Sequence, residues 1–433
     1  ALPISDAASQ AGTVAGNQVP ATHGHYAVRE VYAEGLLPLV KDLPFIEYAE
    51  LGGAVRYAKY STAGSATSWK INGMWQIFDD LKLRAADSSA TRAPNIAELF
   101  TPRAQTFPGI SSDLCGGGAT DPNVITNCAA QIAALGPPPA GAPTTPAPTQ
   151  AQRQGVGGYT SGNPNLKPET AYTLTVGAVY TPGWLPGLQA TVDYYDIRVH
   201  GYIAGLNPQT TQQACYGSDP SLFATNVFCQ QILRQYTVGE GPIIQQINFP
   251  TFNLGSIKTS GVDTTITYAF QLGDIDPGLN NAGGFNLSLN TTYISHFDTD
   301  PGIPGVDVIQ SGGDAGVQHW RGVFRSTYTN GPLDVTTSVR FIGPAYVSKE
   351  SANPLGDSEN PSNHIPSVWY LDMNVAYDVT EMVQLYAGAN NLFDNRPPET
   401  YPGSGLDTTG TGTIAEVYDP IGLFGYVGVN LKM

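Results

Sequence analysis

Four cysteines are the residues of this sequence whose type and spacing most readily support chemistry. Cys115 and Cys128 lie in one long irregular stretch, and Cys215 and Cys229 lie in a second. Four cysteines allow three pairings, and pairing within each stretch closes two short loops, which suits an oxidising compartment such as the periplasm or the cell surface. A metal site is the alternative, but neither pair has the Cys-x-x-Cys spacing and no histidine lies within a few residues. We therefore expect two disulfides.

Other residues that could do chemistry are scattered along the chain. The six histidines form no ligand pattern, and the pair His23 and His25, which could hold a metal, is expected to belong to a polar linker. No nucleophile elbow, P-loop or HExxH motif is present. We assign no catalytic residue, no metal site and no cofactor, and expect that the protein is not an enzyme.

Composition narrows the class of protein. The chain has 433 residues, of which only 13% are charged and 41% are apolar, whereas soluble proteins carry about 25% charged residues. A net charge of −16 argues against binding to nucleic acid, which needs lysine and arginine to neutralise phosphates. This charge indicates a solvated acidic surface or, alternatively, acidic loops that attract a cation or a metal chelate. No run approaches the roughly 18 apolar residues of a spanning helix.

The elements that would position these residues are strands in which apolar and polar side chains alternate. At the end of the chain, Leu423, Gly425, Val427, Val429, Leu431 and Met433 share one face. Period-two alternation predicts strands with one apolar and one polar face. A change of phase after Tyr194 predicts a β-bulge near Tyr195. About thirteen such segments are expected near residues 25–37, 48–60, 69–77, 81–85, 172–180, 188–199, 262–270, 285–293, 320–328, 333–341, 369–377, 383–389 and 423–433.

The connections between these segments are of two kinds. One set is short, as at Lys41–Pro44, Phe78–Asp80 and Asn330–Pro332. The other set holds long stretches, above all 93–165 and 207–250, which contain both cysteine pairs. Within the first of these, the proline-rich segment Pro137–Gln152 is expected to be extended or disordered. Short turns at one end and long loops at the other predict an all-β, transmembrane antiparallel β-barrel with the long loops outside the cell.

A barrel gives each side of the strands its own environment. On the side facing the lumen we expect a polar wall that favours anionic or hydroxyl-rich ligands, although lumen charges also pair with each other or with a plug. On the side facing lipid, aromatic residues are expected to form interfacial girdles. The lumen candidates are Lys70, Arg84, Arg321, Arg325 and Arg340, and the lipid-interface aromatics are Trp69, Tyr180, Tyr194, Phe270, Tyr328, Trp369 and Tyr377.

Several segments, in order, resemble the C-terminal half of TonB-dependent outer-membrane receptors. They are LKLRAADSSATRAPNIAELF at Leu81–Phe100, GNPNLKPET at Gly162–Thr170, VDYYDI at Val192–Ile197, NLGSIKTSGVD at Asn253–Asp263 and NNLFDNRPP at Asn390–Pro398. The resemblance covers nearly everything from about His23 to Met433. It implies that the roughly thirteen strands correspond to the C-terminal portion of a 22-stranded barrel in the outer membrane of a Gram-negative bacterium.

The resemblance also implies a domain organisation. Residues 1–22 would be a polar linker or the remnant of an extracellular loop, and residues 23–433 the C-terminal part of the barrel. A plug domain and a TonB-contacting segment are not recognised in this chain, so we expect a fragment of a longer receptor that reaches the TonB complex only through that plug. Met433 stands where receptors of this family usually end in an aromatic residue.

The function expected from these features is TonB-dependent uptake of a scarce nutrient, such as a siderophore, cobalamin or a carbohydrate. The expected partners are outer-membrane lipid, the missing N-terminal strands and plug, and a small-molecule or oligomeric ligand at the extracellular loops, with no nucleic acid. Two alternatives are a passive porin-like channel and a secreted, soluble β-rich binding protein. Upstream sequence would separate the channel from the receptor, and solubility without detergent would identify the secreted protein.

Overall fold

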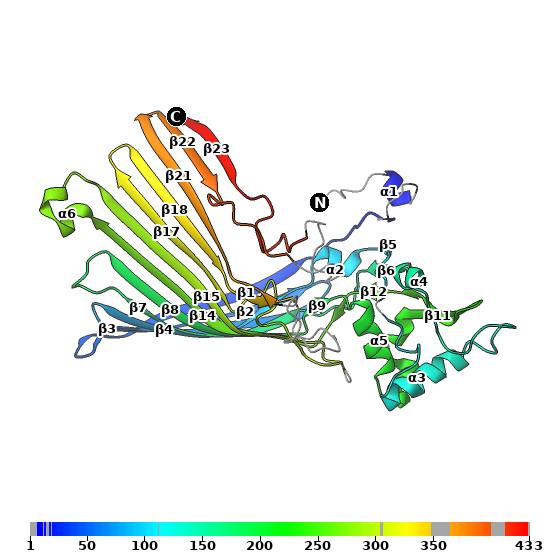
Figure 1. The fold of residues 1–433 in the computed structure, drawn as a ribbon. Coiled ribbons are helices and arrows are strands. Elements are labelled where there is room, and N and C mark those ends of the chain that lie inside the picture. The colour runs from blue at the N-terminus through cyan, green and yellow to red at the C-terminus, as the bar shows by residue number, and fades with distance from the viewer. Residues whose placement is uncertain are drawn as a thin grey trace.

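A computed structural model shows one large, curved antiparallel sheet from which long loops extend at one end (Figure 1). It describes residues 7–11, 13, 17–18, 20–110, 112–303, 306–347, 364–399 and 412–431. Lys432 and Met433, with which the last predicted strand ends, lie outside the described residues. None of the described helices is both long and apolar enough to cross a membrane.

Thirteen strands follow one another through the sheet in chain order, each antiparallel to the next, and the short strand β16 (Ile309–Gln310) pairs with one of them from outside this path. The sequence-based expectation of about thirteen strands is confirmed. The strands are β1 (Val28–Leu43), β2 (Ile46–Tyr60), β3 (Gly64–Phe78), β4 (Leu81–Arg92), β7 (Glu169–Tyr180), β8 (Leu188–His200), β14 (Ser256–Gln271), β15 (Gly284–Asp300), β17 (Trp320–Asn330), β18 (Leu333–Ile342), β21 (Val368–Thr380), β22 (Val383–Asn390) and β23 (Phe424–Leu431).

The sheet is open in this structure. Its path begins at β1 and ends at β23, and these two edge strands do not pair with each other. Strand β1 therefore carries its backbone pairing on one side only, with β2, and β23 pairs only with β22. An edge of this kind presents unpaired N–H and C=O groups to its surroundings.

Apolar and polar side chains stay on opposite faces from one strand to the next because the strands pair in a regular register. In the pair β22–β23, Leu385 lies opposite Val429 and Ala387 lies opposite Val427, so the predicted apolar face is confirmed there. The short connections are hairpin turns at one end of the sheet, except the β2–β3 turn after Tyr60, which lies at the other end. Between β17 and β18 the turn contains Gly331, whose φ of +57° is readily adopted by glycine.

The bulge expected near Tyr195 is wrong. Strand β8 pairs with β7 and with β14 without a shift of register, so Ile197 and Val199 lie on the polar face. The register shift falls instead at Ser260/Gly261 of β14 against β15. Here a side chain would not fit, because a Cβ at Gly261 would contact the carbonyl oxygen of Tyr293 and the ring of Tyr195.

The apolar face of the sheet carries two rows of aromatic rings. The first, beside the short turns, joins Tyr268 to Phe270 (ring centroids 4.8 Å apart), Phe270 to Phe285 (5.7 Å) and Phe285 to Tyr328 (5.0 Å). The second contains the pairs Tyr293–Trp320 (4.8 Å) and Phe341–Trp369 (4.3 Å).

These two rows bound an apolar band. On β15 the rows are represented by Phe285 and Tyr293, and eight residues at about 3.3 Å each span about 26 Å along the strand. Strands tilted by about 40° would convert this length into a height of about 20 Å, close to the about 25 Å apolar band of outer-membrane barrels. Beyond the second row the same face becomes polar, since Lys258 lies between Arg198 and Asp298.

The remaining elements lie in the connections. In the two longest they are α2 (Ile96–Phe100), β5 (Ala104–Thr106), α3 (Pro122–Ala133), α4 (Gln150–Gln154), β6 (Gly158–Ser161), β9 (Ile203–Ala204), α5 (Pro208–Tyr216), η1 (Pro220–Thr225), η2 (Cys229–Gln231), β10 (Ile232–Thr237), β11 (Gly241–Ile247), β12 (Phe249–Pro250) and β13 (Phe252–Asn253). Elsewhere they are α1 (Ala7–Ala11), α6 (Leu272–Ile275), η3 (Pro277–Leu279), β19 (Ala345–Tyr346) and β20 (His364–Ile365).

Candidate functional site

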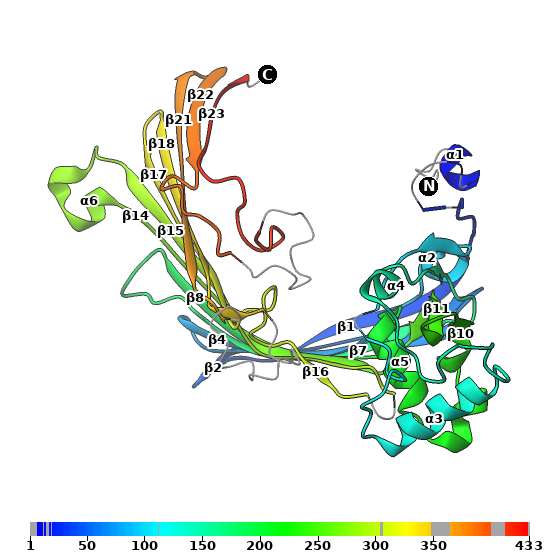
Figure 2. The same ribbon diagram turned by 45° about the vertical axis from the view of Figure 1, so that its right-hand side comes forward.

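The two longest loops fold together into one compact body, which we call the loop unit and define as the described residues of 101–165 and 201–253. Figure 2 shows it at the end of the sheet opposite the short turns. The loop unit has its own apolar core. Residues from both loops build this core, namely Ile110, Cys115, Cys128 and Val156 from the first and Cys215, Tyr216, Cys229, Ile232, Ile244 and Ile247 from the second.

Both predicted disulfides are present in the loop unit. Cys115 bonds to Cys128 on α3, and Cys215 on α5 bonds to Cys229. All four sulfur-bearing residues belong to the same core. The bridges therefore fix each loop internally, while the packing between loops depends on other side chains.

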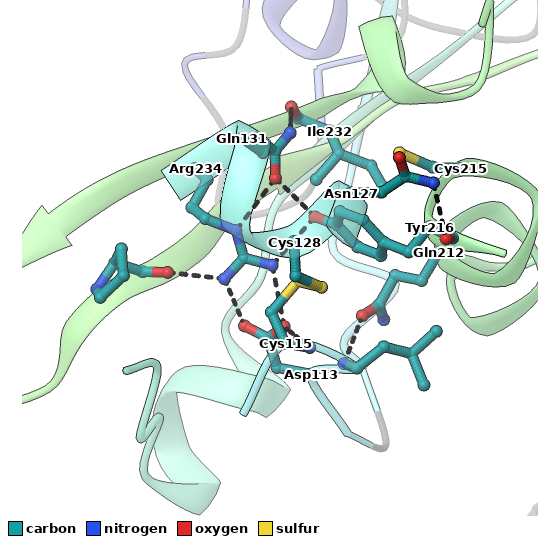
Figure 3. Close-up of a disulfide and its surroundings, with 12 residues drawn as sticks. Asp113, Cys115, Asn127, Cys128, Gln131, Gln212, Cys215, Tyr216, Ile232 and Arg234 are labelled. Carbon is teal, nitrogen blue, oxygen red and sulfur yellow. Dashed lines mark hydrogen bonds and ion pairs between the residues drawn. A yellow bond between two sulfur atoms is a disulfide. The ribbon is translucent and has the colours of Figure 1, made fainter. Parts of the chain in front are cut away.

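A buried arginine joins the two loops at the centre of this core. Arg234 on β10 and Asp113 of the first loop form an ion pair with an N–O distance of 2.7 Å, and their side chains are 0% and 1% exposed. The same guanidinium donates to the Pro242 carbonyl oxygen (2.6 Å) and the Tyr216 hydroxyl (2.9 Å), and its Nε donates to Gln131 Oε1 (3.1 Å) (Figure 3). Every branch of the guanidinium has a partner, which is what a buried charge requires.

The electrostatics of this cluster follow from burial and pairing. Burial alone would lower the pKa of Arg234, but the hydrogen bonds and charge of Asp113, with those of Tyr216, leave that pKa above its usual value. Burial raises the pKa of the Tyr216 hydroxyl, and the neighbouring Arg234 offsets part of this rise. The cluster thus favours a charged guanidinium beside a neutral phenol.

A second polar cluster attaches the loop unit to the sheet. At the end of β4, Arg92 binds Glu169 at the start of β7 (Nε–Oε2 2.6 Å) and Glu98 on α2 (Nη1–Oε2 3.0 Å). Glu98 also closes a capping box, since its carboxylate accepts from the Asn95 amide (2.8 Å) while Asn95 Oδ1 accepts from the Glu98 amide (2.9 Å). This arrangement turns the chain sharply from strand into loop.

Three of the five motifs singled out in the sequence meet at this place. Asn253 accepts from the Lys167 amide (2.8 Å) and donates to the carbonyl oxygens of Lys167 and Gly201 (both 2.9 Å). Asn163 donates to the Thr251 carbonyl oxygen (3.0 Å). Segments from Leu81–Phe100, Gly162–Thr170 and Asn253–Asp263 are thereby joined where β4, β7, β8 and β14 leave the sheet.

The five basic residues predicted to line the lumen share the polar face of the sheet. Arg84 on β4 reaches across β7 to Asp193 on β8 and forms two hydrogen bonds of 2.8 and 2.6 Å with its carboxylate. Gly177 lies directly between them in the register, and a Cβ there would come within 2.7 Å of Asp193 Cγ. A glycine at this position thus allows the pair to form across an intervening strand.

Arg321 and Arg340 hold part of the last loop against the polar face. Arg340 lies 3.0 Å from Asp372, 3.9 Å from Asp419 and 5.0 Å from the Tyr370 ring centroid. Arg321 donates to Gln318 Oε1 (2.9 Å), and Gln318 in turn donates to the Tyr418 hydroxyl (3.3 Å). Within the described part of the chain, Lys70, Arg321 and Arg325 form no ion pair, and Lys70 and Arg325 also lack hydrogen bonds like those of Arg321.

The predicted interfacial aromatics all lie on the apolar face. Phe270 and Tyr328 belong to the row beside the short turns, and Trp369 belongs to the second row. Tyr180 and Tyr377 lie close to the short turns at the ends of β7 and β21. Trp69 and Tyr194 lie inside their strands, because β3 and β8 continue beyond them.

Comparison with known families decides what this sheet is. The family model "TonB dependent receptor-like, beta-barrel" matches residues 4–392. The chain belongs to this family. Its sheet, with thirteen strands in its path, is accordingly the sheet of a TonB-dependent receptor β-barrel, and the family resides in the outer membrane of Gram-negative bacteria.

Solved structures agree with this family assignment at the level of the fold. The siderophore receptor PirA from Acinetobacter baumannii superimposes with a TM-score of 0.55 at 14% identity, covering 94% of this chain and 46% of that one. The ferric enterobactin receptor PfeA from Pseudomonas aeruginosa, in complex with BCV-L6, gives a TM-score of 0.56 at 16% identity, with 94% and 45% coverage. The chain thus spans less than half the length of these receptors. No curated protein sequence matches it significantly.

Proposed function

We propose that this chain is the C-terminal barrel portion of an outer-membrane receptor that captures a scarce nutrient at its extracellular loops and imports it with energy relayed by TonB. The observation that carries this proposal is the pair of aromatic rows on one face, which bound an apolar band on the sheet of a TonB-dependent receptor family member. A wall with one lipid-facing and one polar side is what such a receptor needs.

The open sheet supports a larger assembled barrel. Backbone groups of β1 and β23 are unpaired along their outer edges, and each such group would cost several kcal/mol in hydrocarbon. The receptors of similar fold are about twice as long as this chain. We infer that additional strands close the barrel between β23 and β1, and that a plug domain outside this chain contacts TonB.

The parts of this chain then have distinct roles. Residues 1–22 form a linker or part of an extracellular loop, residues 23–433 form the barrel wall, and the loops 93–165 and 207–250 face the outside of the cell. Lys70 and Arg325, which form no ion pair among the described residues, are the lumen cations best placed to meet an anionic ligand or a plug carboxylate. The aromatic rows contact the membrane interfaces.

A siderophore is the first ligand class to test, because the compared structures are of a siderophore receptor and a ferric enterobactin receptor. Cobalamin and carbohydrates follow. The gene would be deleted from its host and restored, and growth measured with each nutrient as the limiting supply, in strains with and without TonB. We expect one nutrient to require both the gene and TonB.

Other outcomes of this experiment identify the rival functions. Uptake that needs the gene but not TonB would indicate a passive channel. Recovery of the protein in the soluble fraction without detergent would indicate a secreted binding protein. Either outcome would overturn the proposed function.

A further inference from the structure

An apolar groove opens on the loop unit beside the disulfide between Cys115 and Cys128. The groove, which we call the α3 groove, has a volume of about 500 Å³. One wall is α3, which contributes Ile125, Ala129, Ile132 and Ala133. The other walls are the segment Leu114–Ala119, the segment Thr144–Pro146 and the ring of Tyr236. This volume is in the range of about 300–1,000 Å³ that is common for small-molecule sites.

The chemistry of the α3 groove is apolar and uncharged. Among the described residues that line it, none is aspartate, glutamate, lysine or arginine. The side chain of Ile125 on α3 is 53% exposed, whereas other apolar residues of the loop unit are buried in its core. Tyr236 and the two threonines are the lining side chains with hydroxyl groups. An apolar surface with a few polar groups at its edge suits a neutral ligand, whereas a charged one would lose its hydration without gaining an opposite charge.

A disulfide and a backbone hydrogen bond hold the walls of the groove in place. The disulfide between Cys115 and Cys128 ties the segment Leu114–Ala119 to α3, and both cysteines line the groove. The Ala147 amide donates to the Glu240 carbonyl oxygen (2.8 Å), which fixes the segment Thr144–Pro146 beside the β10–β11 hairpin. A Cβ at Gly241 would come within 2.5 Å of the Thr145 carbonyl oxygen, so this contact is close. The groove is therefore preformed, and binding would not have to order its walls.

We propose that the α3 groove binds a neutral small molecule, or the neutral part of a nutrient, through an aromatic or aliphatic group. We infer a neutral ligand because the lining offers no opposite charge to a charged one. The binding of such a ligand does not depend on the proposed function. The assignment of the groove to nutrient capture at the extracellular loops does rest on it.

Two neighbouring alanines provide a matched test of the groove. Ala129 and Ala130 are both exposed on α3, but only Ala129 lines the groove. The variants Ala129→Glu and Ala130→Glu introduce the same charge on the same helix. Binding of 4-methylphenol to the detergent-solubilised protein would be followed by saturation-transfer difference NMR at neutral pH, with benzoate and benzylammonium as charged probes of similar shape and a detergent-only sample as a blank.

We expect saturable binding of 4-methylphenol to the unmodified protein and to Ala130→Glu. The affinity should be lower by about tenfold or more in Ala129→Glu, because a carboxylate on the groove wall would lose water where the apolar ligand packs. The two charged probes should bind at least about tenfold more weakly than 4-methylphenol. Equal binding to both variants, equal binding of the charged probes, or absence of saturable binding would overturn the proposal. Peptide mapping of both disulfides, together with hydrogen-exchange protection of the β10–β11 amides, confirms in each variant that the loop unit is folded.

The uptake experiment separates this inference from the function on which it rests. If nutrient uptake depends on the gene and on TonB but 4-methylphenol does not bind, the groove proposal alone fails. If 4-methylphenol binds in the groove but no nutrient depends on the gene, the proposed function fails and the assignment of the groove to nutrient capture fails with it.

Discussion

Arg234 and Asp113 form a fully buried ion pair although 121 residues separate them in the sequence. Each belongs to a different long loop, and their contact turns two loops into one folded body. The two disulfides cannot do this, because each closes a segment within a single loop. This ion pair therefore adds a buried charged contact to the apolar core that the two loops share.

Replacing Arg234 by methionine should open the loop unit. The substitution leaves the Asp113 carboxylate buried without its partner, and breaking a buried pair in this way costs about 3–5 kcal/mol. Hydrogen exchange of the β10–β11 amides measures the opening free energy directly. The double variant Arg234→Met with Asp113→Leu removes both charges and should recover part of the loss. Unchanged exchange in the single variant would contradict the central role of this pair.

Disulfide mapping should find Cys115 linked to Cys128 and Cys215 linked to Cys229. Proteolysis without reduction, followed by mass spectrometry, identifies the linked peptides. A peptide linking Cys115 to Cys215 or to Cys229 would contradict the structure.

Removing one bridge should weaken the loop unit without affecting the sheet. The variant Cys115→Ser with Cys128→Ser releases a loop with a sequence separation of 13, and closing a loop of this size contributes about 3 kcal/mol. Protease cleavage within residues 101–165 should become faster, whereas the barrel strands should stay protected. Equal cleavage of the strands would show that the loop unit and the sheet unfold together.

Alkaline pH should loosen the loop unit through Tyr216. Burial raises the pKa of this phenol above its ordinary value of 10.0, so the folded unit holds the proton more tightly than the unfolded chain does. The resulting stability is complete below a pH of about 10 and is lost as the pH rises from there towards the folded pKa. Protease protection should fall in this window, and it should fall less in Tyr216→Phe. The control Tyr236→Phe, on β10 of the same loop unit, should behave like the unmodified protein.

An arginine on the apolar face should impair membrane assembly, whereas one on the polar face should not. Leu287 and Ser288 are neighbours on β15 with opposite faces, and Leu287 lies between the two aromatic rows. Arginine at the middle of the bilayer costs about 2–4 kcal/mol on a lipid-facing strand position. Leu287→Arg should therefore lower the fraction of heat-modifiable, folded protein, and Ser288→Arg should leave it unchanged. Equal effects would contradict the assigned faces.

Strand positions could be predicted because alternation is a local property. Trp369, Leu371, Met373, Val375 and Tyr377 already indicate one face of β21, and the structure places all of them within Val368–Thr380. The same rule failed at Tyr195. Beyond the second aromatic row both faces of β8 lie outside the apolar band. Asp196 and Arg198 can therefore follow Tyr194 on the face that is apolar between the two aromatic rows. There the alternation of apolar and polar residues no longer indicates which side contacts lipid.

The loop unit could be predicted only in part. Cysteine spacing predicted the disulfides. The proline-rich segment Pro137–Gln152, expected to be extended or disordered, instead contains turns, and helix α4 begins within it at Gln150. Nothing near Asp113, Tyr216 or Arg234 in the sequence indicates that they meet, because the contact depends on how two separate loops pack. The α3 groove was missed for the same reason, since its walls come from three segments and the β10 strand.

The proposed receptor function depends on which side of the sheet contacts lipid. Single cysteines placed in turn at positions 285–293 of β15 can be spin-labelled, because all four native cysteines are in disulfides. In the assembled protein in lipid vesicles, labels at 285, 287, 289, 291 and 293 should be accessible to oxygen, most strongly at the centre of this range. Labels at 286, 288, 290 and 292 should be accessible to a water-soluble nickel complex instead. Equal accessibility of both sets to the nickel complex, with no period of two, would show that this sheet does not face a membrane.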